Sequence, residues 1–340
     1  MTFFDKYKYD SNTKADYAQV DIDYNFKPID VANLDLNFGE IDGDKRQTAH
    51  LTTPEASSAV VAPRDYTPDT KKLTAGTASD VDVDIPATGR RSDNTFAVII
   101  ANSDYAHASK VANATNDGRV MEKYLNRTLG IPEKNITTYI DATYGQMASA
   151  MSHLRDIAEA YGNGTFDVIF YYVGHGLPDD ESRKSYILPV DVDPRNTEVC
   201  YPLDKLYGQL GELGANSVTV LIDACFSGAN HGDGMLLAQS MGVVLRPKAV
   251  SPTGNMVVLS AAQGDETAYP YGAKNHGLFT YWLLKKLKES RGDVSLGDLS
   301  DYVTENVRKT SVIENRKMQN PAVAVSPALT AVWRTLPLVK

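Results

Sequence analysis

The 340-residue sequence has little cysteine, no long apolar run and no excess of positive charge. With only Cys200 and Cys225, the chain cannot be a disulfide-stapled scaffold, and we expect free thiols. No apolar run approaches the roughly 18 residues of a membrane-spanning helix, so we expect no membrane partner. The net charge of -9, without any basic block, argues against nucleic acid as a partner.

Residues 1–92 differ in composition from the rest of the chain. Apolar and polar residues alternate at 20–26 and 34–38, which predicts two short strands, with a hairpin across Lys27-Pro28. Thr, Ala, Ser, Asp and Pro then dominate, interrupted by a short alternation at 81–85. We therefore predict a partly irregular extension over 1–92. The start of the chain has no secretory apolar region, so we expect a cytoplasmic protein, or an extracytoplasmic one if a leader has been removed.

Apolar strands and amphipathic helices alternate from residue 93 onward. The patterns predict strands at 96–101, 136–140, 166–173, 218–222, 256–261 and 322–325. They predict helices at 115–129, 144–161, 203–213, 278–289 and 296–309. Such alternation with short connections indicates an α/β fold, in which helices cover both faces of a mostly parallel sheet.

Two of the predicted strands end in residues that suggest nucleophilic catalysis. The apolar run 218–222 is followed by Asp-Ala-Cys225, and the run 166–173 by Gly174-His175-Gly176. Because open α/β sheets place their chemistry at the carboxyl ends of the strands, we expect the thiol and the imidazole to meet there. A thiolate is the reactive form of cysteine, and a neighbouring histidine can take its proton.

These motifs resemble a known family. Tyr172-Val-Gly-His-Gly176 and Asp223-Ala-Cys-Phe-Ser-Gly228 resemble the His and Cys boxes of the caspase-like cysteine peptidases, which include caspases, metacaspases and bacterial orthocaspases. In caspases the His lies about 50 residues before the Cys, and here the separation is 50. The Cys box has Asp-Ala-Cys-Phe-Ser-Gly where caspases have Gln-Ala-Cys-Arg-Gly, which favours the metacaspase side.

Two further boxes extend the resemblance over about residues 95–326. Ala114-Thr-Asn-Asp-Gly118 resembles the Asn-Asp box of metacaspase domains, and Ala261–Ala268 with His276–Trp282 resembles the start of the small-subunit half. The resemblance implies a caspase-like three-layer αβα sandwich over residues 93–340, preceded by a pro-region at 1–92. Its large-subunit-like part would reach about residue 228, followed by a loop at 229–254 and a small-subunit-like part at 255–340.

The resemblance also implies the catalytic roles. Cys225 would be the nucleophile, His175 the general acid and base, and the backbone N–H groups of Gly176 and Cys225 the oxyanion hole. Glycine after His175 would let the backbone approach the substrate closely. Cys200 and the remaining histidines, His276 among them, lack such a context, and we expect them to be structural.

Substrate specificity follows from the box-to-box match. Metacaspases recognise Arg or Lys at P1 with acidic residues, and Asp117 and Asp223 stand at the matching positions. Asp223 lies two residues before Cys225, so both side chains share one face of an extended strand. A carboxylate there suits a guanidinium or ammonium group. The alternatives are a helix N-cap for Asp117 and a capping or turn residue for Asp223.

Specificity for Arg or Lys would make the chain its own substrate. We expect a zymogen that processes itself after Arg90 or Arg91, at the domain border, or after Lys248 in the long loop. The resemblance also allows activation by calcium, because many metacaspases need it. The acidic residues 179–181, 191 and 193 do not have EF-hand spacing, so we predict no metal site and no cofactor.

Two alternatives to this function remain open. One is a non-catalytic caspase-like scaffold or regulator, against which the presence of both His175 and Cys225 argues. The other is a peptidase of the clostripain or gingipain kind from the same clan. By analogy with metacaspases we expect a monomer whose partners are protein or peptide substrates with a basic P1 residue.

Overall fold

The computed structural model describes residues 37–39, 46–48, 79–179, 182–226, 249–263 and 266–340. The chain divides into two compact units, Met1–Lys72 and Leu73–Lys340. In the first unit, strands β1 (Asn37–Gly39) and β2 (Arg46–Thr48) pair in antiparallel orientation. The predicted strand at 20–26 and the hairpin across Lys27-Pro28 lie outside the described residues.

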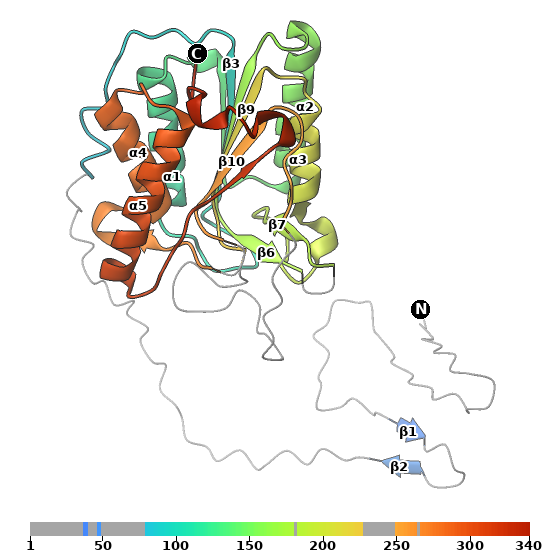
Figure 1. Ribbon diagram of the computed structural model, residues 1–340. Helices are drawn as coiled ribbons and strands as arrows, with labels where there is room; N and C mark the ends of the chain where they lie inside the picture. Colours follow the sequence, from blue (N-terminus) through green and yellow to red (C-terminus); the bar gives the residue numbers. More distant parts are fainter. Residues whose placement is uncertain (1–36, 40–45, 49–78, 180–181, 227–248, 264–265) are drawn as a thin grey trace. The chain divides into compact units, whose positions relative to one another are not determined.

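A six-stranded sheet forms the centre of the second unit (Figure 1). Its strands in spatial order are β13 (Ala322–Val325), β10 (Met256–Ser260), β9 (Ser217–Asp223), β5 (Asp167–Val173), β3 (Thr95–Ala101) and β4 (Ile136–Ile140). The strands from β10 to β4 are parallel to one another, and β13 joins β10 in antiparallel orientation. The predicted mostly parallel sheet is confirmed.

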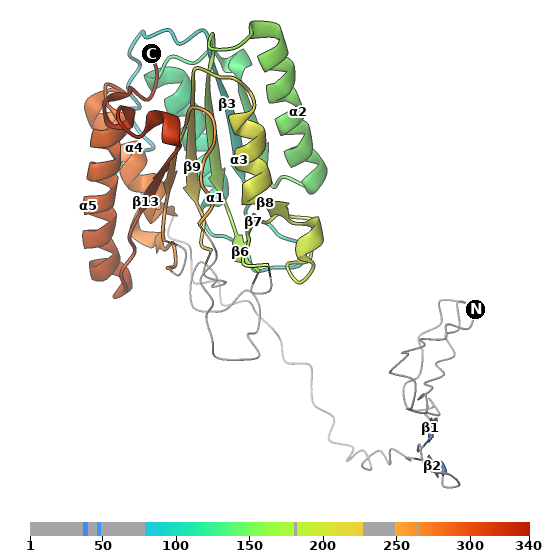
Figure 2. The ribbon, with the colours of Figure 1, turned by 45° about the vertical axis from the view of Figure 1, so that its right-hand side comes forward.

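Helices cover both faces of this sheet (Figures 1 and 2). One face carries α1 (Ala114–Lys123), α4 (Leu278–Ser290) and α5 (Leu296–Asn315), and the other carries α2 (Tyr144–Tyr161) and α3 (Leu203–Gly211). Because side chains of a strand alternate between faces, the apolar strands supply two cores. Ile99, Tyr171 and Leu221 belong to one core, and Val98, Phe170 and Val220 to the other. The three-layer αβα arrangement is therefore confirmed.

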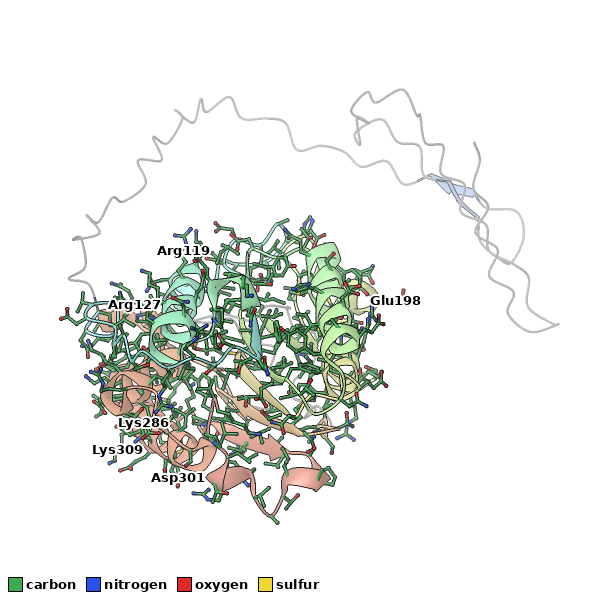
Figure 3. The ribbon with its side chains drawn as sticks, turned by 90° about the horizontal axis from the view of Figure 1, so that it is seen from above. Arg119, Arg127, Glu198, Lys286, Asp301 and Lys309 are labelled. Carbon is green, nitrogen blue, oxygen red and sulfur yellow. The ribbon has the colours of Figure 1, made fainter. Side chains whose placement is uncertain are left out.

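The helix ends follow local sequence signals. A capping box begins α2, in which Thr143 Oγ1 accepts from the Gln146 N–H and Gln146 Oε1 accepts from the Thr143 N–H. Helix α1 continues as a π-helical turn, Tyr124–Thr128, which accounts for the predicted helix at 115–129. Charged side chains such as Lys286, Asp301 and Lys309 lie at the periphery of the helical layers (Figure 3).

Two small sheets and several short turns complete the unit. Strands β6 (Gly176–Pro178), β7 (Ser185–Ile187) and β8 (Tyr201–Pro202) form one sheet, and β11 (Pro270–Tyr271) and β12 (His276–Gly277) form the other. The 3-10 turns are Glu133–Asn135, Thr197–Val199, Gly272–Lys274, Pro327–Leu329 and Trp333–Thr335. Because β6 begins soon after β5 ends, its sheet lies at the carboxyl edge of the central sheet, at the lower end in Figure 1.

The segment Ser79–Ser92, here called the leading segment, packs on the same unit, although the sequence placed the domain border at residues 92 and 93. Val81 and Ile85 are buried in the core beneath α1 and α4, whereas Val83 is 43% exposed. The residues around Val83 form a turn rather than the expected alternating strand. The Tyr124 hydroxyl donates to the Val81 carbonyl, and the Ser92 N–H donates to the Gly130 carbonyl. The leading segment is thus an integral layer of the folded unit.

Candidate active site

His175 and Cys225 follow the ends of two neighbouring parallel strands. Strand β5 pairs with β9 so that Val173 lies opposite Asp223, and the Gly174 N–H donates to the Asp223 carbonyl. Each of the two predicted catalytic residues comes two positions after this pair. Both side chains are buried, with 1% exposure. The strand register therefore places His175 and Cys225 after neighbouring strand ends at the carboxyl edge of the sheet.

Backbone and aromatic contacts orient His175. Its N–H donates to Tyr105 Oη (2.8 Å), its carbonyl accepts from Tyr172 Oη (2.7 Å), and the Tyr105 ring lies 4.7 Å from the imidazole. Imidazole Nε2 lies 2.7 Å from the Ser109 carbonyl oxygen. A carbonyl only accepts, so this contact places the ring proton on Nε2. Sequence reasoning missed both Tyr105 and Ser109, because they lie in a connection without a motif of its own.

The Cys225 thiol is bonded to the backbone of Ala268. Sγ accepts from the Ala268 N–H at 2.8 Å and lies 3.4 Å from the Ala268 carbonyl oxygen. Burial raises the pKa of the thiol to about 12; the Ala268 N–H opposes this rise and the Asp223 charge adds to it. The thiol is therefore protonated at neutral pH in this structure, whereas the proposed chemistry needs a thiolate.

Gly176 occupies a position where a larger residue would not fit. A Cβ there would lie 2.3 Å from the Cys225 carbonyl oxygen and 2.7 Å from the Phe226 ring. The sequence predicted that glycine permits a close backbone approach at this point. In the structure the approaching group is the backbone of Cys225 itself, so the two residues assigned to the oxyanion hole are in contact.

Asp117 and Asp223 converge on Gly277. A Cβ on Gly277 would lie 2.3 Å from Asp223 Oδ2 and 3.3 Å from Asp117 Oδ2, and both carboxylates are 1% exposed. Asp223 Oδ2 accepts from the Thr280 hydroxyl at 2.7 Å, and Asp117 Oδ2 accepts from the Gly277 N–H at 2.9 Å. We call these two residues the carboxylate pair.

The alternatives considered for the carboxylate pair describe its contacts only in part. The N-cap of α1 is Asn113, so Asp117 lies inside the helix and is not the cap. Asp223 closes no local turn, but its Oδ2 accepts from both the N–H (3.2 Å) and the hydroxyl of Thr280 in the first turn of α4, which is a capping contact made from a distant strand. The structure thus brings the two predicted specificity residues together in a buried position.

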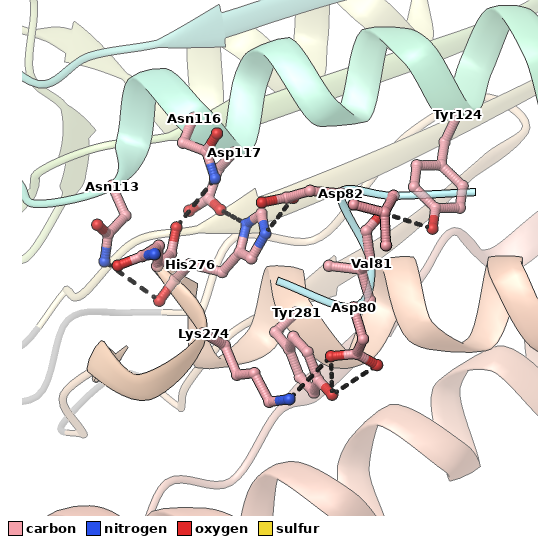
Figure 4. A network of polar contacts seen from close by, with 12 residues as sticks. Asp80, Val81, Asp82, Asn113, Asn116, Asp117, Tyr124, Lys274, His276 and Tyr281 are labelled. Atoms are coloured by element: carbon pink, nitrogen blue, oxygen red, sulfur yellow. Dashed lines mark hydrogen bonds and ion pairs between the residues drawn. The ribbon is translucent and has the colours of Figure 1, made fainter. Parts of the chain in front are cut away.

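His276, which the sequence suggested was structural, lies against Asp117 of the carboxylate pair (Figure 4). It is 0% exposed; Nδ1 lies 2.5 Å from Asp117 Oδ1, and Nε2 lies 2.8 Å from Asp82 Oδ1 in the leading segment. Burial raises the pKa of Asp117 to about 7, against the hydrogen bond from His276. Burial lowers the pKa of His276, but the two carboxylates outweigh burial and raise it above its ordinary value. The one sequence signal that could have pointed to a role for His276 in the site was its place in the His276–Trp282 box.

The structure describes Arg90 and Arg91, two of the three predicted cleavage residues. Arg90 is exposed and forms an ion pair with Asp293 (3.0 Å), and Arg91 forms one with Asp93 (3.3 Å). The Arg90 carbonyl packs so closely on Gly130 that a Cβ at Gly130 would lie 2.2 Å from its oxygen. Lys248 lies outside the described residues. The chain around Arg90 is therefore docked on the folded unit.

Within the described ranges, no group of three or more His, Cys, Asp or Glu side chains is arranged to hold a metal ion. Two of the acidic residues considered for calcium have other partners: Asp191 Oδ1 accepts from the Tyr144 N–H, and Asp193 forms an ion pair with Arg195. Among the helices that the structure describes, none is long and apolar enough to cross a membrane. Calcium activation stays a prediction.

The layered fold, with His and Cys at neighbouring strand ends, is the arrangement expected of a caspase-like protein. The family model described as Caspase domain matches residues 94–331, so the chain belongs to this family of peptidases. The fold is similar to caspase-1 from Spodoptera frugiperda, with a TM-score of 0.50 and 13% identity over 74% of this chain and 95% of that one. A protein from Geobacter sulfurreducens is also similar, with a TM-score of 0.51 and 19% identity over 72% of this chain and 98% of that one. No curated protein matches this chain in sequence.

Proposed function

We propose that this protein is a cysteine endopeptidase that cleaves after Arg or Lys with a Cys225–His175 dyad. The observation that supports the dyad is the register of β5 and β9, which brings two Gly-flanked strand ends together. The convergence of Asp117 and Asp223 on Gly277 supports a basic P1 residue, because two carboxylates can bind a guanidinium through several charge-assisted hydrogen bonds.

The residues suggest the following chemistry. His175 accepts the thiol proton at Nδ1, since Nε2–H is held by the Ser109 carbonyl, and Cys225 Sγ attacks the peptide carbonyl carbon. The C–N bond breaks, the imidazolium returns the proton to the leaving amine, and a thioester remains. Water, deprotonated by His175, then hydrolyses the thioester. The N–H groups of Gly176 and Cys225 would stabilise the oxyanion in both steps.

The buried, protonated thiol supports a latent form that is activated by processing. In an active form Sγ would exchange its contacts with Ala268 for contacts with His175 and substrate. Cleavage after Arg90, Arg91 or Lys248 is the processing step that we propose. A buried thiol bonded to Ala268 is also compatible with the alternative function, a non-catalytic scaffold. The scaffold hypothesis predicts that no processing exposes an active thiol.

Fluorogenic peptides with Arg, Lys or Asp at P1 test this function, with and without calcium. We expect cleavage after Arg and Lys, none after Asp, and loss of cleavage in Cys225→Ala. Intact masses of the wild type and Cys225→Ala after long incubation test self-processing. Cleavage after Asp would reject the P1 assignment while keeping the dyad. Inactivity under every condition, with residues 1–72 removed as well, would favour the scaffold.

A further inference from the structure

The leading segment contributes a carboxylate to the surroundings of the carboxylate pair. Asp82 binds His276 Nε2, and the other ring nitrogen of the same imidazole binds Asp117 (Figure 4). A neutral imidazole has one N–H donor and an imidazolium has two. With carboxylates on both nitrogens, His276 and its partners therefore hold one proton more than a neutral imidazole between ionised carboxylates would.

His276 supplies a counter-charge that the carboxylate pair needs. Asp117 and Asp223 are both buried, and the charge of Asp223 adds to the rise in the pKa of Asp117. Two carboxylates this close resist ionising together unless a cation is near. Protonated His276 is a cation in direct contact with Asp117. Lys274 does not take this role, because it is bonded to Asp80.

Two acidic residues of the leading segment have separate partners. Asp80 binds Lys274 (2.9 Å), Lys285 (2.7 Å) and the Tyr281 hydroxyl (3.1 Å), which anchors the segment on α4 and the turn before it. Asp82, two residues later, binds the imidazole instead. Because the two positions share one segment, their variants can separate an anchoring role from an electrostatic one.

We propose that His276 is a positioning residue for the P1 site, and that Asp82 of the leading segment controls its charge. His276 orients Asp117 and neutralises it until a P1 cation arrives, so the leading segment is part of the substrate site and stays docked there even when the chain is cut after Arg90 or Arg91. This inference rests on the proposed function, because the P1 site belongs to it.

The inference predicts a pH dependence of P1 recognition. A proton retained by the Asp117–His276 pair opposes binding of a P1 cation, so kcat/KM for Arg substrates rises as this proton is lost. Removing the Asp82 charge makes the imidazolium less stable, so the proton leaves at lower pH. The titratable or charged groups around Asp117 and His276 are Asp82 and Asp80 from the leading segment, Asp223 from β9, Tyr171 from β5, Tyr124 from the π-helical turn, Tyr281 from α4 and Lys274 from the turn before β12.

The test compares Asp82→Asn with Asp80→Asn and Asp82→Glu in the full chain. Histidine NMR titration in the Cys225→Ala background measures the pKa of His276 without any need for activity. We expect Asp82→Asn to lower that pKa by at least about 1, Asp80→Asn to leave it in place, and Asp82→Glu to restore it. In the active protein, the acid limb of kcat/KM for an Arg substrate should move to lower pH in Asp82→Asn alone.

The outcomes separate this inference from the proposed function. Equal effects of Asp80→Asn and Asp82→Asn, or no effect of either, would reduce Asp82 to an anchor and overturn the inference. Thermal unfolding of each variant shows whether loss of the fold is responsible. If the pKa of His276 responds as expected but no Arg or Lys substrate is cleaved, the proposed function fails and the P1 role falls with it, while the link from Asp82 to His276 stands.

Discussion

The dyad and the carboxylate pair are built in different ways. His175 and Cys225 come from adjacent strands whose pairing fixes them in register, and both side chains bond to neutral backbone groups. Asp117 and Asp223 come from different elements and are joined through α4, β12 and the leading segment by charged contacts. The positions of the two reacting groups therefore follow from the strand register and neutral backbone contacts, whereas the carboxylate pair depends on charged contacts between several elements of the unit.

The largest expected effect is the loss of peptide cleavage when a residue of the dyad is replaced, compared with replacement of the other cysteine. Cys225→Ala should abolish Arg or Lys cleavage, and His175→Ala should reduce kcat by about 10²–10⁴, because each removes a reacting group. Cys200→Ala is the matched control: its thiol is also buried but belongs to a separate apolar cluster. It should keep wild-type kinetics in the fluorogenic assay. Equal losses from Cys200→Ala and Cys225→Ala would reject the dyad.

A smaller effect is expected when the carboxylate pair is changed. Asp223→Asn should lower kcat/KM for Arg substrates by about 30-fold or more, because a buried charge partner of the P1 cation is lost. The rate of Cys225 alkylation by iodoacetamide should fall little, since this reagent needs no P1 site. The alkylation rate is the internal control. A parallel loss of both rates would show that Asp223 acts on the nucleophile rather than on P1.

The smallest expected effect is on stability. The pKa of Asp117 rises from 3.8 to about 7 on folding, so the folded state holds this proton more tightly than the unfolded chain. Its contribution to the free energy of unfolding is complete below about pH 4 and is lost as pH rises to about 7. Urea unfolding at pH 5 and pH 8 should show a smaller difference in Asp117→Asn than in wild type. Asp156→Asn, an exposed residue of α2, should keep the wild-type difference.

Much of the fold could be predicted because its signals are local. The strands at Ile136–Ile140 and Ala322–Val325 and the helix at Tyr144–Tyr161 begin and end where the sequence indicated. Each is a continuous apolar or periodic run bounded by turn residues or a cap. The position of His175 and Cys225 after neighbouring strand ends followed from the same signals, because parallel strands share one edge.

The electrostatic part of the site could not be predicted in this way. Nothing in the residues around His276 indicates that Asp82 will lie on one side of its ring and Asp117 on the other, since this contact depends on how the leading segment packs. The alternation at Val81, Val83 and Ile85 suggested a strand, but Val83 faces out of a turn. The hydrogen bond at the buried Cys225 thiol likewise comes from a residue distant in sequence, Ala268.

The central claim is that Cys225 is a nucleophile with a P1 site for a basic residue beside it. Peptide chloromethyl ketones ending in Arg or in Asp test both parts in one mass-spectrometric measurement on the processed protein. We predict that the Arg probe adds one label, at Cys225, with loss of chloride, and that the Asp probe adds none. Labelling by both probes at equal rates, or labelling of Cys200 instead, would contradict the account.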